Sequence, residues 1–228
     1  MNTIVYKNII LHIPDRYYHK NLTNRFENNT YEKEELYLSH KYLNKNDNVL
    51  ELGSCLGVIA SSLSNICNNV ISIEANPELK DALQLTKKHN KLDNVTFLSG
   101  YLDIEERIVE FQTYDNIVAG SGDREDLEIN NVRGWGHTLK KYNVHTILLN
   151  KINNYTEINC LVIDIEGGEL DFLQKFKDFI LVNINKLCIE LHGHLMKDKL
   201  FNRKCLTLLN EMGFKLKDRL GISYYFEK

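Results

Sequence analysis

The sequence lacks a surplus of positive charge and any long apolar segment. Its 228 residues include 28 Lys and Arg against 31 Asp and Glu, a net charge of −3. Without a basic surplus or a run of basic residues, nucleic acid is not an expected partner. No apolar run approaches the roughly 20 residues needed to cross a bilayer, so no membrane span is expected. The first 15 residues also lack the layout of a signal peptide.

The sequence is also poor in cysteine, and the five cysteines are odd in number. They are widely spaced and lie mostly within apolar segments, which is typical of reduced core residues and not of a disulfide framework. We therefore expect a cytoplasmic protein. There is no internal repeat or low-complexity tract. The length and the 43% of hydrophobic residues fit one soluble globular domain.

From residue 49 onward, apolar segments of strand length alternate with segments of helical periodicity. This alternation predicts an α/β fold, a doubly wound, Rossmann-like sheet of seven mostly parallel strands. Residues 214–226 alternate in two short runs around Gly221, as in an antiparallel hairpin that closes one edge of the sheet. The expected parallel strands cover residues 49–52, 70–74, 95–98, 161–165 and 187–191.

Two further segments flank or interrupt this pattern. Residues 1–48 are expected to form an N-terminal β and helical cap, with a helix over 30–43, ahead of a main domain over 49–228. Residues 101–159 are too long for a simple helical crossover and contain strand-like pieces at 107–111, 116–119 and 145–149. Insertions of this size in α/β proteins often carry specificity, so we expect this one to shape the binding site.

A glycine-containing turn follows the first of the parallel strands, in the segment VLELGSCLGVIA. Gly53 and Gly57 allow the backbone to approach a ligand at the start of a helix. A dinucleotide-binding motif would have glycine at the positions of Cys55 and Val58. With side chains there, the backbone cannot approach a pyrophosphate closely. The acid before the turn, Glu51, suits a ligand that carries positive charge.

Glu74 ends the second parallel strand, 21 residues after Gly53, where a carboxylate can bind ribose hydroxyls. A ribose joined to a cationic amino-acid group, without a diphosphate, describes S-adenosylmethionine. The alternative is a structural turn followed by a surface acid.

The chain resembles the FkbM-type family of class I methyltransferases. The resemblance lies in VLELGSCLG, VISIEANP, HNKLDNVTFLSG, CLVIDIEGGELDFL and KLCIELHG, in that order and within residues 30–195. It implies the class I methyltransferase fold, binding of S-adenosylmethionine, and methyl transfer, usually to a hydroxyl of a saccharide or secondary metabolite. One departure is Cys55, where members of the family commonly have asparagine.

The expected cofactor site combines the turn with the ends of neighbouring strands. The resemblance suggests that Tyr31 and Glu32 fold over the cofactor. Asp103 is expected to accept the adenine amino group, and Tyr101 or Leu102 to flank the ring. The full expected set is Tyr31, Glu51, Gly53, Ser54, Gly57, Glu74, Ala75, Asn76, Tyr101, Asp103 and Asp164.

The expected catalytic groups are Asp164, Glu166 and His192. The fourth parallel strand should lie beside the first at the switch point of the sheet, which brings Asp164 next to the methyl donor. Asp164 would orient the acceptor hydroxyl or take its proton, and Glu166 would help to bind the acceptor or the methionine amine. His192, with an ordinary pKa near 6.5, is a candidate general base in its neutral form.

Other interpretations of these residues stay open. His192 can cap its strand without a catalytic role, or Asp164, Glu190 and His192 can hold a divalent cation, which neither the spacing nor the resemblance favours. An acid at Glu169, in a first helical turn, is explained by the helix dipole. Trp135 either stacks on a sugar or anchors the insertion.

These observations predict a cytoplasmic S-adenosylmethionine-dependent O-methyltransferase that acts on a saccharide, a glycan or a similar small molecule. The alternatives are a non-catalytic cofactor-binding or scaffold protein with the same fold, and a metal-assisted methyltransferase with a different acceptor. An NAD-linked enzyme is disfavoured by Cys55 in the glycine turn.

Overall fold

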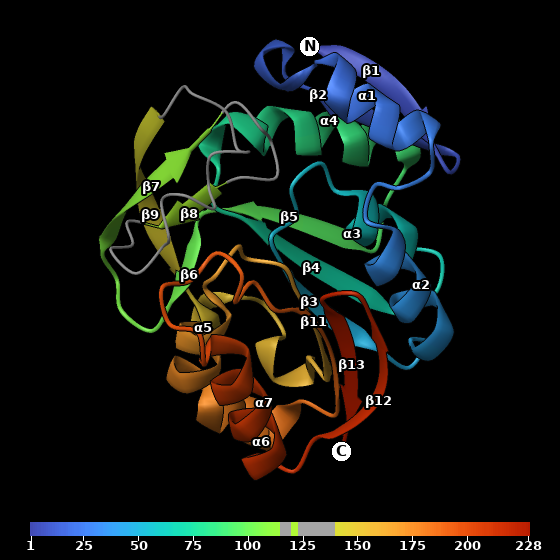
Figure 1. Cartoon of the computed structure of the whole chain (residues 1–228). Coiled ribbons are helices and arrows are strands. Elements are labelled where there is room, and N and C mark those ends of the chain that lie inside the picture. The colour runs from blue at the N-terminus through green and yellow to red at the C-terminus, as the bar shows by residue number, and fades with distance from the viewer. Residues whose placement is uncertain (115–119, 123–139) are drawn as a thin grey trace.

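The computed structural model describes residues 1–114, 120–122 and 140–228. Within these residues, the centre of the molecule is a seven-stranded sheet in the order β12-β13-β11-β10-β3-β4-β5 (Figure 1). The strands are β3 (Asn48–Leu52), β4 (Asn69–Glu74), β5 (Val95–Ser99), β10 (Cys160–Ile163), β11 (Lys186–Glu190), β12 (Lys215–Leu220) and β13 (Ser223–Glu227).

Strands β5, β4, β3, β10 and β11 run parallel, whereas β13 is antiparallel to both β11 and β12. The expected doubly wound sheet with a C-terminal hairpin at one edge is therefore confirmed. The first and fourth parallel strands, β3 and β10, are direct neighbours, with Glu51 opposite Val162. β10 ends at Ile163, so Asp164 already lies beyond the strand, at the carboxyl edge of the sheet.

Helices cover both faces of the sheet (Figure 1). Side chains alternate along β3, so that Val49 packs in one hydrophobic core and Leu50 and Leu52 pack in the other. The first core includes α2 (Lys33–Tyr42), α3 (Val58–Leu63) and α4 (Lys80–Asn90), and the second includes α5 (Glu169–Lys175), α6 (Lys177–Asn183) and α7 (Phe201–Glu211). Such a three-layer arrangement leaves the carboxyl ends of the parallel strands open for a site.

The sequence signals at two helix ends are confirmed. The Asn76 side chain accepts a hydrogen bond from the Glu78 N–H (3.0 Å), and Pro77 opens the 3₁₀ turn η2 (Pro77–Leu79) ahead of α4. Gly213 follows α7 with a φ of +89°, the left-handed conformation expected after a helix. The helix expected over 30–43 begins later, at Lys33.

The N-terminal segment packs against α4. It consists of the hairpin β1 (Asn2–Tyr6) and β2 (Ile9–Ile13), the 3₁₀ turn η1 (Asp15–Tyr17) and α1 (Lys20–Glu27), and Figure 1 shows it beside α4. The Asn90 side chain pairs with both backbone groups of Ile10, accepting from its N–H (2.8 Å) and donating to its carbonyl (2.7 Å). The hairpin is thus held to a helix of the main sheet.

The described residues between 101 and 148 form a second, smaller sheet beside the central one. Its order is β6-β9-β7-β8, from β6 (Tyr101–Asp103), β7 (Ile108–Thr113), β8 (Gly120–Gly122) and β9 (Lys140–Leu148). It is followed by two 3₁₀ turns, η4 (Leu149–Lys151) and η5 (Tyr155–Glu157). The strand-like pieces at 107–111 and 145–149 largely coincide with β7 and the end of β9. The piece at 116–119 and Trp135 lie outside the described residues. In the part of the chain that the structure describes, no helix combines the length and apolarity of a membrane span.

Candidate active site

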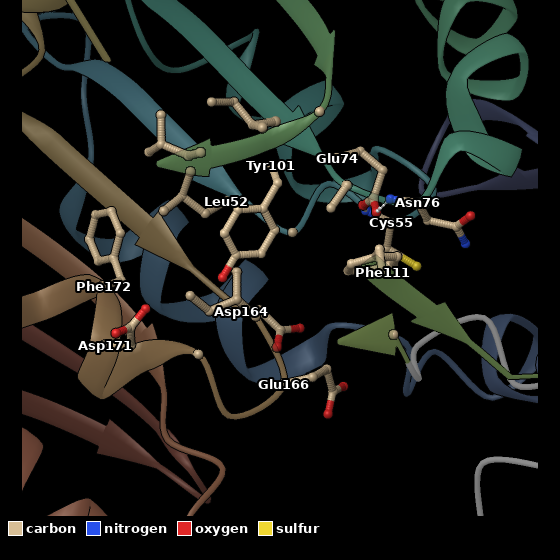
Figure 2. Close-up of a pocket in the computed structure, with 18 of the residues that line it drawn as sticks. Leu52, Cys55, Glu74, Asn76, Tyr101, Phe111, Asp164, Glu166, Asp171 and Phe172 are labelled. Atoms are coloured by element: carbon tan, nitrogen blue, oxygen red, sulfur yellow. Dashed lines mark hydrogen bonds between the residues drawn. The ribbon is translucent and has the colours of Figure 1, made fainter. Parts of the chain in front are cut away.

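A pocket with about 1030 Å³ of open space lies at the carboxyl ends of β3, β4 and β10. Figure 2 shows Glu74, Cys55 and Asn76 grouped at one side, Asp171 and Phe172 at the other, and the Tyr101 ring between them. The pocket therefore sits at the switch point between β3 and β10, as the sequence predicted.

Gly53 forms the floor of the pocket, where β3 meets β10. Its φ is +90°, and a Cβ atom added to it would lie 1.7 Å from the backbone carbonyl oxygen of Asp164. Both facts require glycine at this position. The turn therefore joins the segment after β3 to the segment after β10 at van der Waals distance.

Glu74 is fixed at the end of β4 by backbone N–H groups. Its Oε2 accepts from the Cys55 N–H (2.7 Å) and its Oε1 accepts from the Asn76 N–H (2.7 Å), as the dashed lines in Figure 2 show. Burial raises the pKa of Glu74 to about 7, although these backbone hydrogen bonds act in the opposite direction. Because a carboxylate has about four acceptor positions, both oxygens keep capacity for ligand hydroxyls.

Cys55, which also lines the pocket, has a left-handed backbone with a φ of +46°. Such a conformation is costly for most side chains and is best tolerated by glycine and asparagine. Glu32 (φ +51°) and Glu166 (φ +48°) share this conformation and also line the pocket. Three of the eight described non-glycine residues with positive φ thus line the pocket, and such strain is common at functional sites.

The opposite end of the pocket is lined by aromatic rings and by one ion pair. Tyr101, Phe172 and Phe176 contribute rings, and Lys175 Nζ lies 3.1 Å from Asp171 Oδ2. Flat apolar surfaces with a few polar groups suit a heteroaromatic ring such as a purine.

A cluster of carboxylates surrounds His192 at the acidic wall of the pocket. The imidazole Nδ1 is 2.9 Å from Glu169 Oε1, and Nε2 lies 3.5 Å from Asp164 Oδ1, 3.6 Å from Glu166 Oε2 and 3.4 Å from Glu190 Oε2. His192 and Glu169 are buried, whereas Asp164 and Glu166 reach the pocket. The expected catalytic residues are therefore close together.

The charge state of His192 differs from the sequence-based expectation of a neutral imidazole. Burial lowers its pKa, but the charges of Glu166 and Glu169 and the hydrogen bonds to Glu169 and Glu190 outweigh burial and raise the pKa well above 6.5. The acidic neighbours of His192 therefore favour its protonated form. Burial raises the pKa of Asp164 well above its ordinary value and that of Glu166 to about 7, which places Glu166 in the range of a general base.

The structure brings part of the expected set together in the pocket. The lining includes Gly53, Glu74, Ala75, Asn76, Tyr101, Asp164 and Glu166. The other expected residues do not line it: Tyr31, Glu51, Ser54, Gly57, Asp103 and His192. His192 stands one layer behind Asp164 and Glu166, and the remaining five have other contacts.

Glu51 and Ser54 belong to a buried network beneath the turn. Ser72 Oγ donates to Glu51 Oε2, and the hydroxyls of Ser54 and Ser72 are hydrogen-bonded to each other. The alternation of β3 turns Glu51 toward the core that holds Val49, away from the pocket. Burial raises the pKa of Glu51 to about 8.

Tyr31, Gly57 and Asp103 also have structural contacts. The Tyr31 hydroxyl lies 3.1 Å from Cys55 Sγ, so the ring supports the pocket wall from behind. Gly57 has a φ of +76°, a conformation that favours glycine, and a Cβ there would also approach the end of the Leu83 side chain to 2.9 Å. Asp103 accepts hydrogen bonds from Arg107 Nε (2.9 Å) and Nη2 (2.6 Å), and its Oδ1 accepts from the Ile104 N–H (2.7 Å).

Sequence reasoning missed several residues of the site. Glu169 was explained by the helix dipole, yet its side chain is fully buried and contacts His192. Asp171, Phe172 and Lys175 lie on the pocket-facing side of the same helix, α5. The signal available was the density of acids in IEGGELD, directly after a strand at the switch point.

Comparison with known proteins agrees with this geometry. A family model described as a methyltransferase FkbM domain matches residues 51–216. Among solved structures, an FkbM methyltransferase from Methylobacillus flagellatus KT is 16% identical, with 81% of this chain and 44% of that chain covered and a TM-score of 0.51. Trm5b from Pyrococcus abyssi is 12% identical, with 98% and 54% covered and a TM-score of 0.50.

A putative transferase from Pyrococcus horikoshii is 10% identical, with 98% of this chain and 68% of that chain covered and a TM-score of 0.51. The chain spans about half the length of the Methylobacillus and P. abyssi proteins, 44% and 54%. No curated protein matches. At these identities the structural likeness concerns the fold, and it confirms the expected Rossmann-like architecture.

Proposed function

Because the chain belongs to the FkbM family of S-adenosylmethionine-dependent methyltransferases, we propose that it methylates a hydroxyl of a saccharide, a glycan or a similar small molecule. One observation carries this proposal. A single pocket has the fixed carboxylate of Glu74 at one side and the acids Asp164 and Glu166 at another, and Gly53 also lines it.

The pocket residues fit S-adenosylmethionine, which supplies an electrophilic methyl group when bound. Glu74 accepts hydrogen bonds from the two ribose hydroxyls, because backbone N–H groups hold both of its oxygens in place. The aromatic end, with Tyr101 and Phe172, takes the adenine ring. The turn at Gly53 offers close approach to the methionine part, and the neighbouring carboxylates offset the positive charge of the sulfonium.

Asp164 and Glu166 serve the acceptor. The acceptor oxygen forms a bond to the methyl carbon while the carbon–sulfur bond breaks, with its electron pair passing to sulfur and the hydroxyl proton passing to a carboxylate. Asp164 orients the hydroxyl, and Glu166, with a pKa of about 7, takes the proton. His192 positions both carboxylates through its charge. Most of the rate enhancement then comes from alignment of the two reactants.

The nature of the acceptor rests on the family and on the polar wall. Glu32, Asp164 and Glu166 present acceptor oxygens to the pocket, which suits a ligand with several hydroxyl groups. A cytoplasmic location, where small activated sugars are available as acceptors, is part of the proposal and is supported by five cysteines that are all free thiols.

The test combines binding and turnover. Calorimetry should detect binding of S-adenosylmethionine to the protein. Labelled cofactor should transfer its methyl group to a member of a panel of nucleotide sugars and glycans. Asp164→Asn and Glu166→Gln should each lower kcat at least tenfold when the cofactor is saturating, beyond any weakening of cofactor binding. Cofactor binding without turnover across the panel would favour a scaffold protein, and stabilisation by NAD alone would contradict the cofactor assignment.

A further inference from the structure

We propose that Asp164, Glu190 and His192 form a binding site for a divalent cation that holds the acceptor hydroxyl beside the methyl donor. The catalytic part of this inference rests on the proposed function, whereas the binding part does not. These three residues offer one ligand atom each, and the three atoms lie within 4.8 Å of one another.

The ligand atoms come from adjacent parallel strands. β10 and β11 pair in register with Ile163 opposite Ile189, so the next residues, Asp164 and Glu190, emerge side by side at the same edge of the sheet. His192 follows two residues later. Its Nε2 is 3.5 Å from Asp164 Oδ1 and 3.4 Å from Glu190 Oε2.

These separations suit ligands of a common ion. Both exceed the usual 2.7–3.2 Å of an N–H···O hydrogen bond. Two ligands bound at about 2.1 Å and separated by 90–109° around a cation would lie about 3.0–3.4 Å apart. The two distances from His192 Nε2 are therefore close to the spacing of ligands on one ion, and the third, between the Asp164 and Glu190 oxygens, is within 4.8 Å.

A buried, unpartnered atom points to the missing ligand. Among the described residues, Oδ1 of Asp164 is buried and makes no hydrogen bond. It is the same oxygen that faces His192 Nε2. A buried carboxylate oxygen without a partner is costly, and a cation at this point would remove the cost.

A second layer of contacts orients two of the three ligands. Glu169 Oε1 lies 2.9 Å from His192 Nδ1 and also accepts from the Gly167 N–H (2.9 Å), so Nδ1 is the donor and Nε2 faces the site. Ser223 Oγ donates to Glu190 Oε1 (2.8 Å), which directs Oε2 toward His192. Metal-binding histidines typically donate their second ring nitrogen to a carboxylate in this way.

The balance of charge also favours a cation. Three more acids, Glu32, Glu35 and Glu166, lie near Asp164. The positive charge of Arg25 acts on Glu32 and Glu166. A divalent ion would compensate part of the negative charge of these carboxylates. Two carboxylate oxygens and one imidazole suit Mn²⁺, which accepts both donor types, and Zn²⁺ and Mg²⁺ are natural competitors.

The cation would activate the acceptor hydroxyl, the role for which a neutral histidine was expected. A hydroxyl bound to it has a lower pKa and loses its proton more readily to Glu166 or to water. The oxygen then attacks the methyl carbon, and the pair of electrons in the carbon–sulfur bond passes to sulfur. His192 would act as a ligand and not as the base.

The test is direct binding of Mn²⁺ to the full chain after treatment with chelator, measured by electron paramagnetic resonance and calorimetry. One equivalent should bind. Glu190→Gln and His192→Gln should each weaken binding at least tenfold, and Glu169→Gln, which leaves all three ligands intact, should weaken it about 10–100-fold. His194→Gln changes an exposed histidine two residues away and should stay within twofold of the wild type. Retained S-adenosylmethionine binding shows that each variant is folded.

Several results would overturn the assignment. One is an absence of saturable Mn²⁺, Mg²⁺ and Zn²⁺ binding by a chain that binds S-adenosylmethionine. Another is binding that survives Glu190→Gln and His192→Gln but is lost in Glu35→Gln, which would place the ion at the neighbouring trio of Glu32, Glu35 and Asp164. Methyl transfer that is unchanged by chelator would overturn the catalytic role. Conversely, Mn²⁺ binding without any methyl transfer would refute the proposed function and support the cation site.

Discussion

Replacing Glu74 with glutamine keeps the shape of the side chain and removes its charge. In the wild type, the two oxygens of Glu74 face the backbone N–H groups of Cys55 and Asn76, each at 2.7 Å. In Glu74→Gln, the amide NH₂ must face one of these N–H groups, so two donors meet. The variant also keeps a single acceptor oxygen for the two ribose hydroxyls.

The expected loss of cofactor affinity follows from these contacts. A hydrogen bond to a charged group contributes about 1.5–3 kcal/mol, and each 1.4 kcal/mol is tenfold in Kd. Losing one such bond to the ribose should raise the Kd for S-adenosylmethionine about 10–150-fold. The backbone N–H left without an acceptor should also lower the free energy of unfolding by about 1–3 kcal/mol.

Calorimetry at pH 8 measures this Kd under conditions in which Glu74, with a pKa of about 7, is ionised. Affinity of the wild type should fall between pH 8 and pH 6 as Glu74 gains a proton, and that of Glu74→Gln should change less. Glu211→Gln, at an exposed glutamate, is the matched control. A Kd within twofold of the wild type for Glu74→Gln would refute the assignment of Glu74 to the ribose.

Three further predictions concern stability. Gly53→Ala should abolish cofactor binding and lower the melting temperature, because its Cβ would lie 1.7 Å from the Asp164 carbonyl oxygen; calorimetry and thermal unfolding check this, and normal binding would contradict the proposed geometry. Glu51 has a pKa of about 8 when folded against an ordinary 4.5, so the stability from its buried protonated form is present below pH 4.5 and lost as pH rises to 8, by roughly 3–5 kcal/mol. In Glu51→Gln, urea unfolding from pH 5 to pH 8 should show a flatter profile, and an unchanged slope would contradict this. Arg107→Ala should lower the free energy of unfolding, measured in urea, by about 1–3 kcal/mol, because buried Asp103 loses two hydrogen bonds. Arg107→Lys should recover part of this loss. An unchanged free energy in Arg107→Ala would show that Lys175, 3.6 Å from Asp103, is a sufficient partner.

The features of the fold that depend on local sequence were predictable. Apolar runs marked β3, β4, β5, β10 and β11 to within two residues, since buried parallel strands are apolar on both faces. Asn76 and Gly213 identified helix ends because their roles depend on a few neighbouring backbone groups. The position of the pocket followed from the strand order of the fold.

The roles of individual side chains were less predictable because they depend on partners distant in sequence. Glu51 was expected in the site, but the alternation of β3 turns it into the core, where its hydrogen-bond partner Ser72 lies on another strand. Asp103 was expected to bind adenine, but its carboxylate accepts hydrogen bonds from Arg107. The state of His192 depends on Glu166, Glu169 and Glu190, which only the folded chain brings around one imidazole.

The contact between Gly53 and the Asp164 carbonyl has a bearing on how this protein can diversify. The two strand ends are in such close contact that neither can shift without the other. The side of the pocket that holds Glu74 is therefore coupled to the side that holds Asp164 and Glu166. New acceptor preferences are therefore more accessible through changes in peripheral segments that contribute Glu32 and Phe111 to the rim. Directed evolution that randomises these outer segments, and leaves the strand junction unaltered, is the economical route to altered selectivity.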